Sequence, residues 1–342
     1  MGHTVSTESN EAVHPYQNLT PDLVLDAIES VGYHVNGRLF PLNSYENRVY
    51  QVGIEDSTPL IAKFYRPRRW SAEQLGEEHG FVAELEAREI PVVGAIPLSN
   101  GDYVAHWKGF DFALYPQRGG QAPDVSMPDT LFRIGQWLAQ IHQVGAIKPF
   151  RARPAFHIVE SIQQCRDFLL GSDFIPDDLR TPYESLIADL LPEIERNIKA
   201  AGETASIRLH GDCHLGNILM REERILFVDF DDARQGPPIQ DIWLLLSGDA
   251  EEQSWQLGEI LEGYEQFNEL NLSERYLIEP LRTLRLINQA AWLGWRWDDP
   301  TFPLHFPWFG QPRFWSDHIL TLREQLSNLQ QPPLTLPGQG NL

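Results

Sequence analysis

One stretch of the chain, residues 209–232, limits the possible folds more than any other. An apolar segment runs into a polar loop at 210–217, and the chain then returns in a hairpin whose apolar second strand, 225–228, ends in acidic residues. Asp229 follows that strand directly, and a carboxylate in buried surroundings is costly unless it is paired or bound to a metal ion. The sequence therefore predicts a hairpin that gathers acidic residues at one end.

Three polar residues of this stretch form a candidate catalytic group. Asp212 and Asn217 lie five residues apart on the loop, and the hairpin would bring both close to Asp229. Oxygen atoms of Asn217 and Asp229 suit a hard cation such as Mg²⁺, while Asp212 can accept a hydroxyl proton. This is the equipment that phosphoryl transfer requires. We expect Asp212 and Asp229 to be catalytic residues, with Asn217 and Asp229 as the metal ligands.

The residues before this stretch predict a small sheet lobe at 20–117. A helix is expected at 21–31, and a capping box at Ser71 predicts a second helix that runs to about residue 88. Apolar and β-branched runs predict strands near 38–42, 48–54, 60–65, 92–97 and 110–115.

The remainder of the chain, 118–329, has mostly helical periodicity from Asp129 onward. The boundary between the two lobes is expected near 117–120, where two adjacent glycines allow a flexible backbone. The ends, 1–19 and 330–342, are polar or rich in Pro and Gly, which predicts poor order. The fold class is therefore α+β, with two lobes and a site between them.

The spacing H-x-D-x-x-x-x-N, with D-F-D twelve residues after the Asn, resembles the catalytic and metal loops of protein kinases. Gly211, in place of the kinase Arg, narrows the resemblance to the branch of aminoglycoside phosphotransferases and choline kinases. Across about 39–315, the chain resembles the bacterial stress response kinase A family, and the segments that show this are 43–50, 63–67, 208–214 and 278–282.

The resemblance implies a kinase-like fold, ATP as co-substrate, Mg²⁺ as cofactor, and the Ser/Thr protein kinase activity assigned to that family. Matched by position, Asp212 is the proton acceptor, Asn217 and Asp229 are Mg²⁺ ligands, and Ser44 contacts ATP. The turn around Ser44 has none of the glycines of a G-x-G-x-x-G loop, and the sequence contains no P-loop motif.

The same resemblance assigns further residues to the nucleotide. Lys63, in an apolar strand, looks like the kinase lysine that pairs the α- and β-phosphates. Its acidic partner should lie on the apolar face of the next helix, where the helix phase favours Glu78 over Glu77. Adenine is expected to bond with the backbone between Tyr115 and Gln117.

Two other functions remain open. The His210-Gly211-Asp212 sequence is shared with small-molecule kinases, so the acceptor could be an amino alcohol, homoserine or an aminoglycoside. A regulatory pseudokinase is the other alternative, and the presence of Lys63 together with the catalytic group argues against it.

Composition narrows the partners. The net charge of −21, without clustered Lys and Arg, argues against nucleic acid, because phosphate backbones are held by such clusters. The acidity serves solubility or, as a second interpretation, an acidic cleft for cationic substrates. Two cysteines, and no apolar run long enough for a membrane helix, predict a cytoplasmic protein without a membrane partner. We expect a monomer.

Four other features have a structural interpretation or an open one. Asp241 matches an Asp that holds the catalytic loop in kinase-like folds, and His142 is expected to pack at a helix end. The tryptophans of 292–297 are assigned to core packing of the helical lobe, with substrate docking as the second interpretation. His214 is left open, because it either orients Asp212 or fills the loop.

Overall fold

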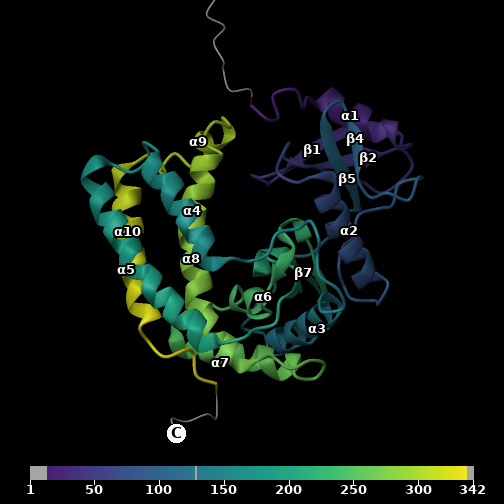
Figure 1. The fold of residues 1–342 in the computed structure, drawn as a ribbon. Helices are drawn as coiled ribbons and strands as arrows, with labels where there is room; N and C mark the ends of the chain where they lie inside the picture. Colours follow the sequence, from purple (N-terminus) through teal and green to yellow (C-terminus); the bar gives the residue numbers. More distant parts are fainter. Residues whose placement is uncertain (1–13, 128, 337–342) are drawn as a thin grey trace, which may run out of the picture.

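The N-terminal lobe is an antiparallel sheet preceded by a helix. The computed structural model describes residues 14–127 and 129–336, and in it α1 (Pro21–Ser30) begins after Thr20, whose side chain accepts a hydrogen bond from the Leu23 N–H. The sheet has the order β1-β2-β3-β5-β4 (Figure 1), and its strands are β1 (Val35–Leu42), β2 (Arg48–Ile54), β3 (Leu60–Phe64), β4 (Ala105–Trp107) and β5 (Phe110–Pro116).

Helix α2 (Ala72–Glu86) joins the two lobes. Its start has the predicted capping box, in which Ser71 and Gln74 satisfy each other's backbone N–H groups. Leu75, in its first half, packs with residues of the sheet, whereas Phe81 and Leu85, in its second half, belong to the core of the C-terminal lobe. The helix therefore holds its middle turn at the junction between the lobes.

The C-terminal lobe is mostly helical and contains two short sheets. Its hairpin consists of β7 (Ile218–Arg221) and β8 (Arg224–Phe227), and β6 (Ile207–Leu209) pairs with β9 (Arg234–Gly236). The α-helices are α3 (Thr130–Gly145), α4 (Ile158–Gly171), α5 (Asp177–Ala201), α6 (Ile239–Trp243), α7 (Ala250–Tyr264), α8 (Ile278–Trp295), α9 (Thr301–His305) and α10 (Pro312–Leu329). Short 3₁₀ turns complete the lobe at η1 (Leu215–Asn217), η2 (Phe230–Asp232) and η3 (Leu272–Leu277).

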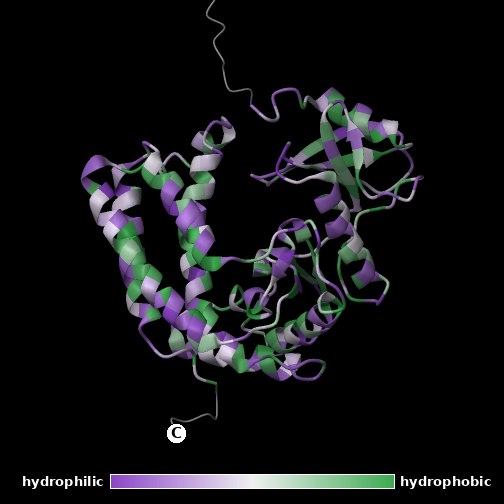
Figure 2. Ribbon diagram, viewed as in Figure 1, coloured by the Kyte–Doolittle hydropathy of each residue, from purple (hydrophilic) through white to green (hydrophobic). Residues whose placement is uncertain are grey.

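Helix α8 packs between two hydrophobic cores of this lobe. Its first turns contact the core around α3 and α7, and its later turns contact the core around α4, α5 and α10. Figure 2 shows apolar and polar residues mixed along the C-terminal helices, as expected for helices that bury one face. Among the described residues, no helix is both long and apolar enough to cross a membrane.

The predicted two-lobed order is confirmed, apart from two places. The strand expected at 92–97 does not form, because Val93 donates to Phe227 O and Phe227 donates to Pro91 O, which joins this segment to the hairpin of the other lobe. Prolines at both ends of the segment also lack the N–H that a strand needs. The short strand β4 was not predicted.

The prediction of poorly ordered ends is wrong for the parts that the structure describes. Tyr16 and Leu19 are buried in the core of the N-terminal lobe, and Leu334 and Leu336 pack against the core of the C-terminal lobe. A few apolar side chains in a polar segment are enough for such anchoring. The rest of the two predicted tails, 1–13 and 337–342, lies outside the described residues.

Candidate active site

A cavity of about 920 Å³ lies between the two lobes, and most of the predicted site residues line it. The N-terminal lobe contributes strand β3 and the turn between β1 and β2. The C-terminal lobe contributes the loop after β6, the hairpin end and one face of α8. The predicted residues found in its lining are Ser44, Lys63, Glu78, Tyr115, Asp212, Asn217 and Asp229.

The loop that carries Asp212 is fixed from behind by the buried Asp241. Its two carboxylate oxygens accept hydrogen bonds from the backbone N–H groups of His210 and Gly211, each at 2.8 Å. His142, fully buried at the end of α3, contacts the same carboxylate through Nε2 at 3.2 Å. The structural roles predicted for Asp241 and His142 are confirmed.

Gly211 is required by the backbone of this loop. Its φ of +86° lies in the left-handed region that favours glycine, and a Cβ atom there would lie 2.1 Å from the carbonyl oxygen of Asp232. An Arg at this position would therefore clash with the segment that follows Asp229.

Asp212 itself is held between two basic side chains. Arg285 Nη1 lies 2.7 Å from Oδ1, and His214 Nε2 lies 3.5 Å from Oδ2. Burial opposes ionisation of this carboxyl, but the contacts with His214 and Arg285 outweigh it and hold the pKa of Asp212 well below its ordinary value. His214 thus has the orienting contact that the sequence left open, whereas Arg285 was not predicted.

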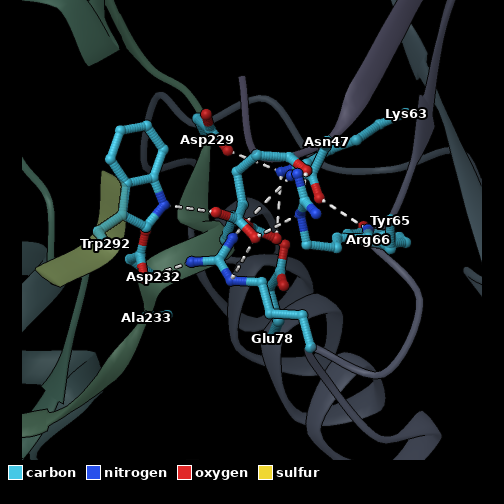
Figure 3. Close-up of polar contacts among 12 residues, drawn as sticks. Asn47, Lys63, Tyr65, Arg66, Glu78, Asp229, Asp232, Ala233 and Trp292 are labelled. Carbon is cyan, nitrogen blue, oxygen red and sulfur yellow. Dashed lines mark hydrogen bonds and ion pairs between the residues drawn. The ribbon is translucent and has the colours of Figure 1, made fainter. Parts of the chain in front are cut away.

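Asp229 and Lys63 meet across the lobes (Figure 3). Lys63 Nζ lies 2.7 Å from Asp229 Oδ1 and 3.4 Å from Asp231 Oδ1, although the three residues come from opposite sides of the cavity. Burial disfavours the charge on Lys63, but the two carboxylates outweigh it and raise the pKa of Lys63 well above its ordinary value. Lys63 is therefore a permanent cation at the centre of the cleft.

The predicted direct ion pair between Lys63 and Glu78 is wrong in this structure. The helix phase is right, since Glu78 is 2% exposed, but its Oε2 pairs with Arg153 Nη2 at 2.5 Å. Burial raises the pKa of Glu78 to about 7, against the opposing effect of Arg153 and Lys63. Arg153 comes from the segment between α3 and α4 and could not be paired with α2 from helix phase alone.

Glu77, the alternative, has a different role. Its carboxylate accepts hydrogen bonds from three successive backbone N–H groups, those of Arg151, Ala152 and Arg153, at 2.6, 3.0 and 2.8 Å. Adjacent glutamates of α2 therefore hold the same segment, one by its backbone and the other by the Arg153 guanidinium.

Asp231, the second acid of the D-F-D sequence, is buried and holds several side chains around Lys63. Arg69 forms ion pairs with Asp231 and Asp232, and Asn47 Nδ2 donates to Asp231 Oδ2 at 3.1 Å. Burial disfavours its charge, yet Lys63, Arg69 and these contacts keep the pKa of Asp231 well below its ordinary value.

The predicted adenine residues lie at the end of β5. Tyr115 lines the cavity, and its hydroxyl lies 3.1 Å from the hydroxyl of Tyr65. Gln117 is exposed, and its side chain donates to Gln51 Oε1 at 3.2 Å. Pro116 and Arg118, on either side of Gln117, line the cavity. A contact between this stretch of backbone and adenine stays a prediction.

A second set of contacts joins the lobes, between the residues around β2 and β3 and those at the end of α8. Glu46, in the turn before β2, accepts hydrogen bonds from Trp292 Nε1 at 2.6 Å and from Arg296. Asp299, 2% exposed, pairs with Arg48 at 3.2 Å and with Arg66 at 2.8 Å. Trp292 packs against the core of the C-terminal lobe, as predicted, and it also lines the cavity and contacts the other lobe.

Asn217 and Asp229 have the donor atoms that a hard cation requires. Asn217 Nδ2 donates to the backbone oxygen of Asp212 at 3.0 Å, and Asp229 Oδ1 accepts from Lys63. Among the described residues, no hydrogen-bond partner is found for Asn217 Oδ1 or for Asp229 Oδ2. Those residues also include no group of three or more His, Cys, Asp and Glu that could hold a metal ion. The pair thus fits a cation that takes its further ligands from bound phosphates and water.

Comparisons with known proteins agree with this geometry. The profile of the phosphotransferase enzyme family matches residues 39–276. Proteins named stress response kinase A from Salmonella choleraesuis (strain SC-B67) and Escherichia coli (strain K12) are each 41% identical over 327 residues, which cover 96% of this chain and 98% of theirs. A relative of the same identity and coverage from Salmonella typhimurium is named serine/threonine protein kinase RdoA.

Solved structures show the same fold. An amicoumacin kinase, solved in complex with AMP-PNP, Ca²⁺ and Ami, aligns with a TM-score of 0.71 at 20% identity, over 92% of this chain and 94% of that one. A microcompartment-associated aminopropanol kinase aligns with a TM-score of 0.68 at 17% identity, over 92% of this chain and 100% of the other. At these identities the likeness concerns the fold alone.

Together, the fold, the catalytic loop and the family match define a kinase-like phosphotransferase, and the chain belongs to the phosphotransferase enzyme family. Its extended similarity to the curated relatives narrows this further. Within that family it belongs with the stress response kinase A proteins, and it is an ATP-dependent kinase.

Proposed function

We propose that this chain is a Mg²⁺-dependent Ser/Thr protein kinase. The observation that carries the proposal is the meeting of Lys63, Asp212, Asn217 and Asp229 in one cavity, in a chain 41% identical to stress response kinase A over nearly its full length. A relative's name as a serine/threonine protein kinase supports the choice of acceptor.

The residues divide the reaction between them. Lys63 offers its ammonium group to the phosphates, and Asn217 and Asp229 would hold Mg²⁺, which neutralises phosphate charge when bound. Asp212 accepts the proton of the acceptor hydroxyl while the hydroxyl oxygen bonds to the γ-phosphorus of ATP. The bond from that phosphorus to the bridging oxygen breaks, and ADP leaves. Ser44, in the turn above the cavity, is proposed to contact the phosphates.

The rival function is a kinase for small amino alcohols, aminoglycosides or homoserine. The structural neighbours of that kind favour it only through the shared fold. One observation argues against cationic acceptors: each carboxylate that lines the cavity already has a basic partner within the protein. These carboxylates are Glu46, Glu78, Asp212, Asp229, Asp231 and Asp232.

The test assays wild type and Asp212→Asn side by side with Mg²⁺ and labelled ATP. Both are offered a general protein substrate, an aminoglycoside panel, choline and homoserine. Labelling of Ser or Thr that is lost in the variant is expected. Transfer to a small alcohol at roughly 1–1000 s⁻¹, without protein labelling, would establish the rival function instead.

A further inference from the structure

We propose that Arg285 selects acceptors that carry an acidic side chain close to the phosphorylated hydroxyl. The inference rests on the proposed kinase function and adds the charge of the substrate. It makes Arg285 of α8 a residue that recognises the acceptor, separate from the residues proposed to bind the nucleotide.

Arg285 stands where the acceptor must arrive. Its Nη1 lies 2.7 Å from Asp212 Oδ1, and His214 lies beside Oδ2 at 3.5 Å. A hydroxyl that gives its proton to Asp212 has to hydrogen-bond with one of these oxygens. Both carboxylate oxygens of Asp212 have basic partners. An acceptor hydroxyl can therefore reach Asp212 only if one of these partners moves away or shares its oxygen with the hydroxyl.

Arg285 is the partner that can move. Its side chain is 49% exposed, and Asp212 is the acidic side chain with which it pairs. Arg282, one turn earlier on the same helix, is held by Glu279 and by Gln253 Oε1, and it lies over the ring of Trp243. A half-exposed ion pair is weak in water. A new anion nearby can therefore replace Asp212 as the partner of the Arg285 guanidinium.

The surroundings of Arg285 favour an anion as that exchange partner. The next residues on the same face of α8, Asn288 and Gln289, are exposed, uncharged and part of the cavity lining. Arg234 lines the same cavity and is paired with Asp232 at 2.8 Å. A carboxylate of the acceptor can form a paired, charge-assisted contact with the guanidinium and release Asp212, whereas a Lys or an amine is repelled.

The experiment measures kcat/KM for peptides that contain one Ser and a single Glu or Lys, placed in turn at each neighbouring position. For wild type, the best Glu peptide should exceed the matching Lys peptide by roughly tenfold or more, as expected for opposed charges at a binding site. Arg285→Gln should bring this ratio close to one, and Arg285→Glu should reverse it. Arg282→Gln is the matched control and should keep the wild-type ratio.

The outcomes separate this inference from the proposed function. A wild-type enzyme that labels peptides without preferring Glu, or an Arg285→Gln variant that keeps the preference, overturns the role of Arg285 and leaves the kinase function intact. If wild type labels neither peptides nor proteins, the proposed function fails, and this inference fails with it. Melting curves show whether each variant is folded. The Arg285→Glu variant gains activity on Lys peptides only if residue 285 contacts the acceptor.

Discussion

On the nucleotide side of the cleft, Lys63, Asp229 and Asp231 belong to a network that continues through Arg69 and Asn47 into the protein. On the acceptor side, Asp212 depends on a half-exposed arginine and one histidine. In the first arrangement Lys63 and Asp231 are buried and several elements from both lobes contribute, although the side chain of Asp229 is 52% exposed. The second rests on one contact from the surface of α8 and one from the loop that carries Asp212.

This difference indicates how the two sides divide their tasks. Buried charges that are held by several partners stay fixed, which suits a co-substrate that is the same in every reaction. Exposed single contacts can be exchanged at little cost, which suits the recognition of a variable acceptor. Substitutions on the nucleotide side should therefore impair every reaction, whereas those on the acceptor side should impair the chemical step or alter substrate choice.

The largest effect is expected for Asp229→Ala. The substitution removes a charged ligand from Mg²⁺, which would have few other protein oxygens as ligands. It also removes one of the two carboxylates that pair with Lys63. Calorimetry should detect no Mg²⁺-dependent binding of ATP, and activity should be lost with every acceptor. If the variant binds MgATP as tightly as wild type, the metal site lies elsewhere, and the contrast between the two sides of the cleft is contradicted.

Asp212→Asn should come next, with a fall in kcat of roughly 10²–10⁴-fold, the usual contribution of a general base. Because Asp212 acts on the acceptor, the affinity for MgATP should stay within a few fold of the wild-type value. Equilibrium binding and steady-state kinetics on the same preparation separate the two effects. A variant that retains a tenth of the activity would show that Asp212 is not the base.

Glu78→Gln should have an intermediate effect on catalysis. It removes the negative charge from the buried partner of Arg153, close to Lys63 and Asp231, so kcat should fall roughly 10- to 100-fold through misplacement of the phosphates.

Glu77→Gln is the matched comparison. The amide oxygen can still accept from the N–H groups of Ala152 and Arg153, which share one oxygen of Glu77, but the amide NH2 then faces the N–H of Arg151. We therefore expect little change in kcat and a small fall in the melting temperature. If Glu77→Gln impairs catalysis more than Glu78→Gln, the segment between α3 and α4 matters more than the buried charge.

Among the substituted residues that line the cavity, the smallest effect is expected for Ser44→Ala. Loss of one hydrogen bond to a phosphate costs about 1 kcal/mol, which corresponds to a rise of about fivefold in the KM for ATP at unchanged kcat. The measurement is a titration of ATP at saturating acceptor. An unchanged KM would remove Ser44 from the nucleotide site while leaving the rest of the network intact.

The sequence alone predicted the two-lobed order of elements and the catalytic loop, because both depend on local patterns. His210, Gly211, Asp212 and Asn217 are within one loop, and the hairpin of β7 and β8 brings Asp229 close to them. The capping box of α2 and the inward phase of Glu78 follow from spacing within one helix. Local geometry was sufficient for these features.

Only the tertiary structure decided which charges pair across the molecule. Arg285 is 73 residues from Asp212, Arg153 is 75 residues from Glu78, and Asp299 joins the C-terminal lobe to arginines more than 230 residues earlier. No spacing rule links such residues, because their partners depend on how helices pack between the lobes. For the same reason residues 92–97, which have strand-forming side chains, divide their contacts between the lobes: Val93 bonds to Phe227 of the hairpin, and Ile96 N–H donates to Leu114 O of β5.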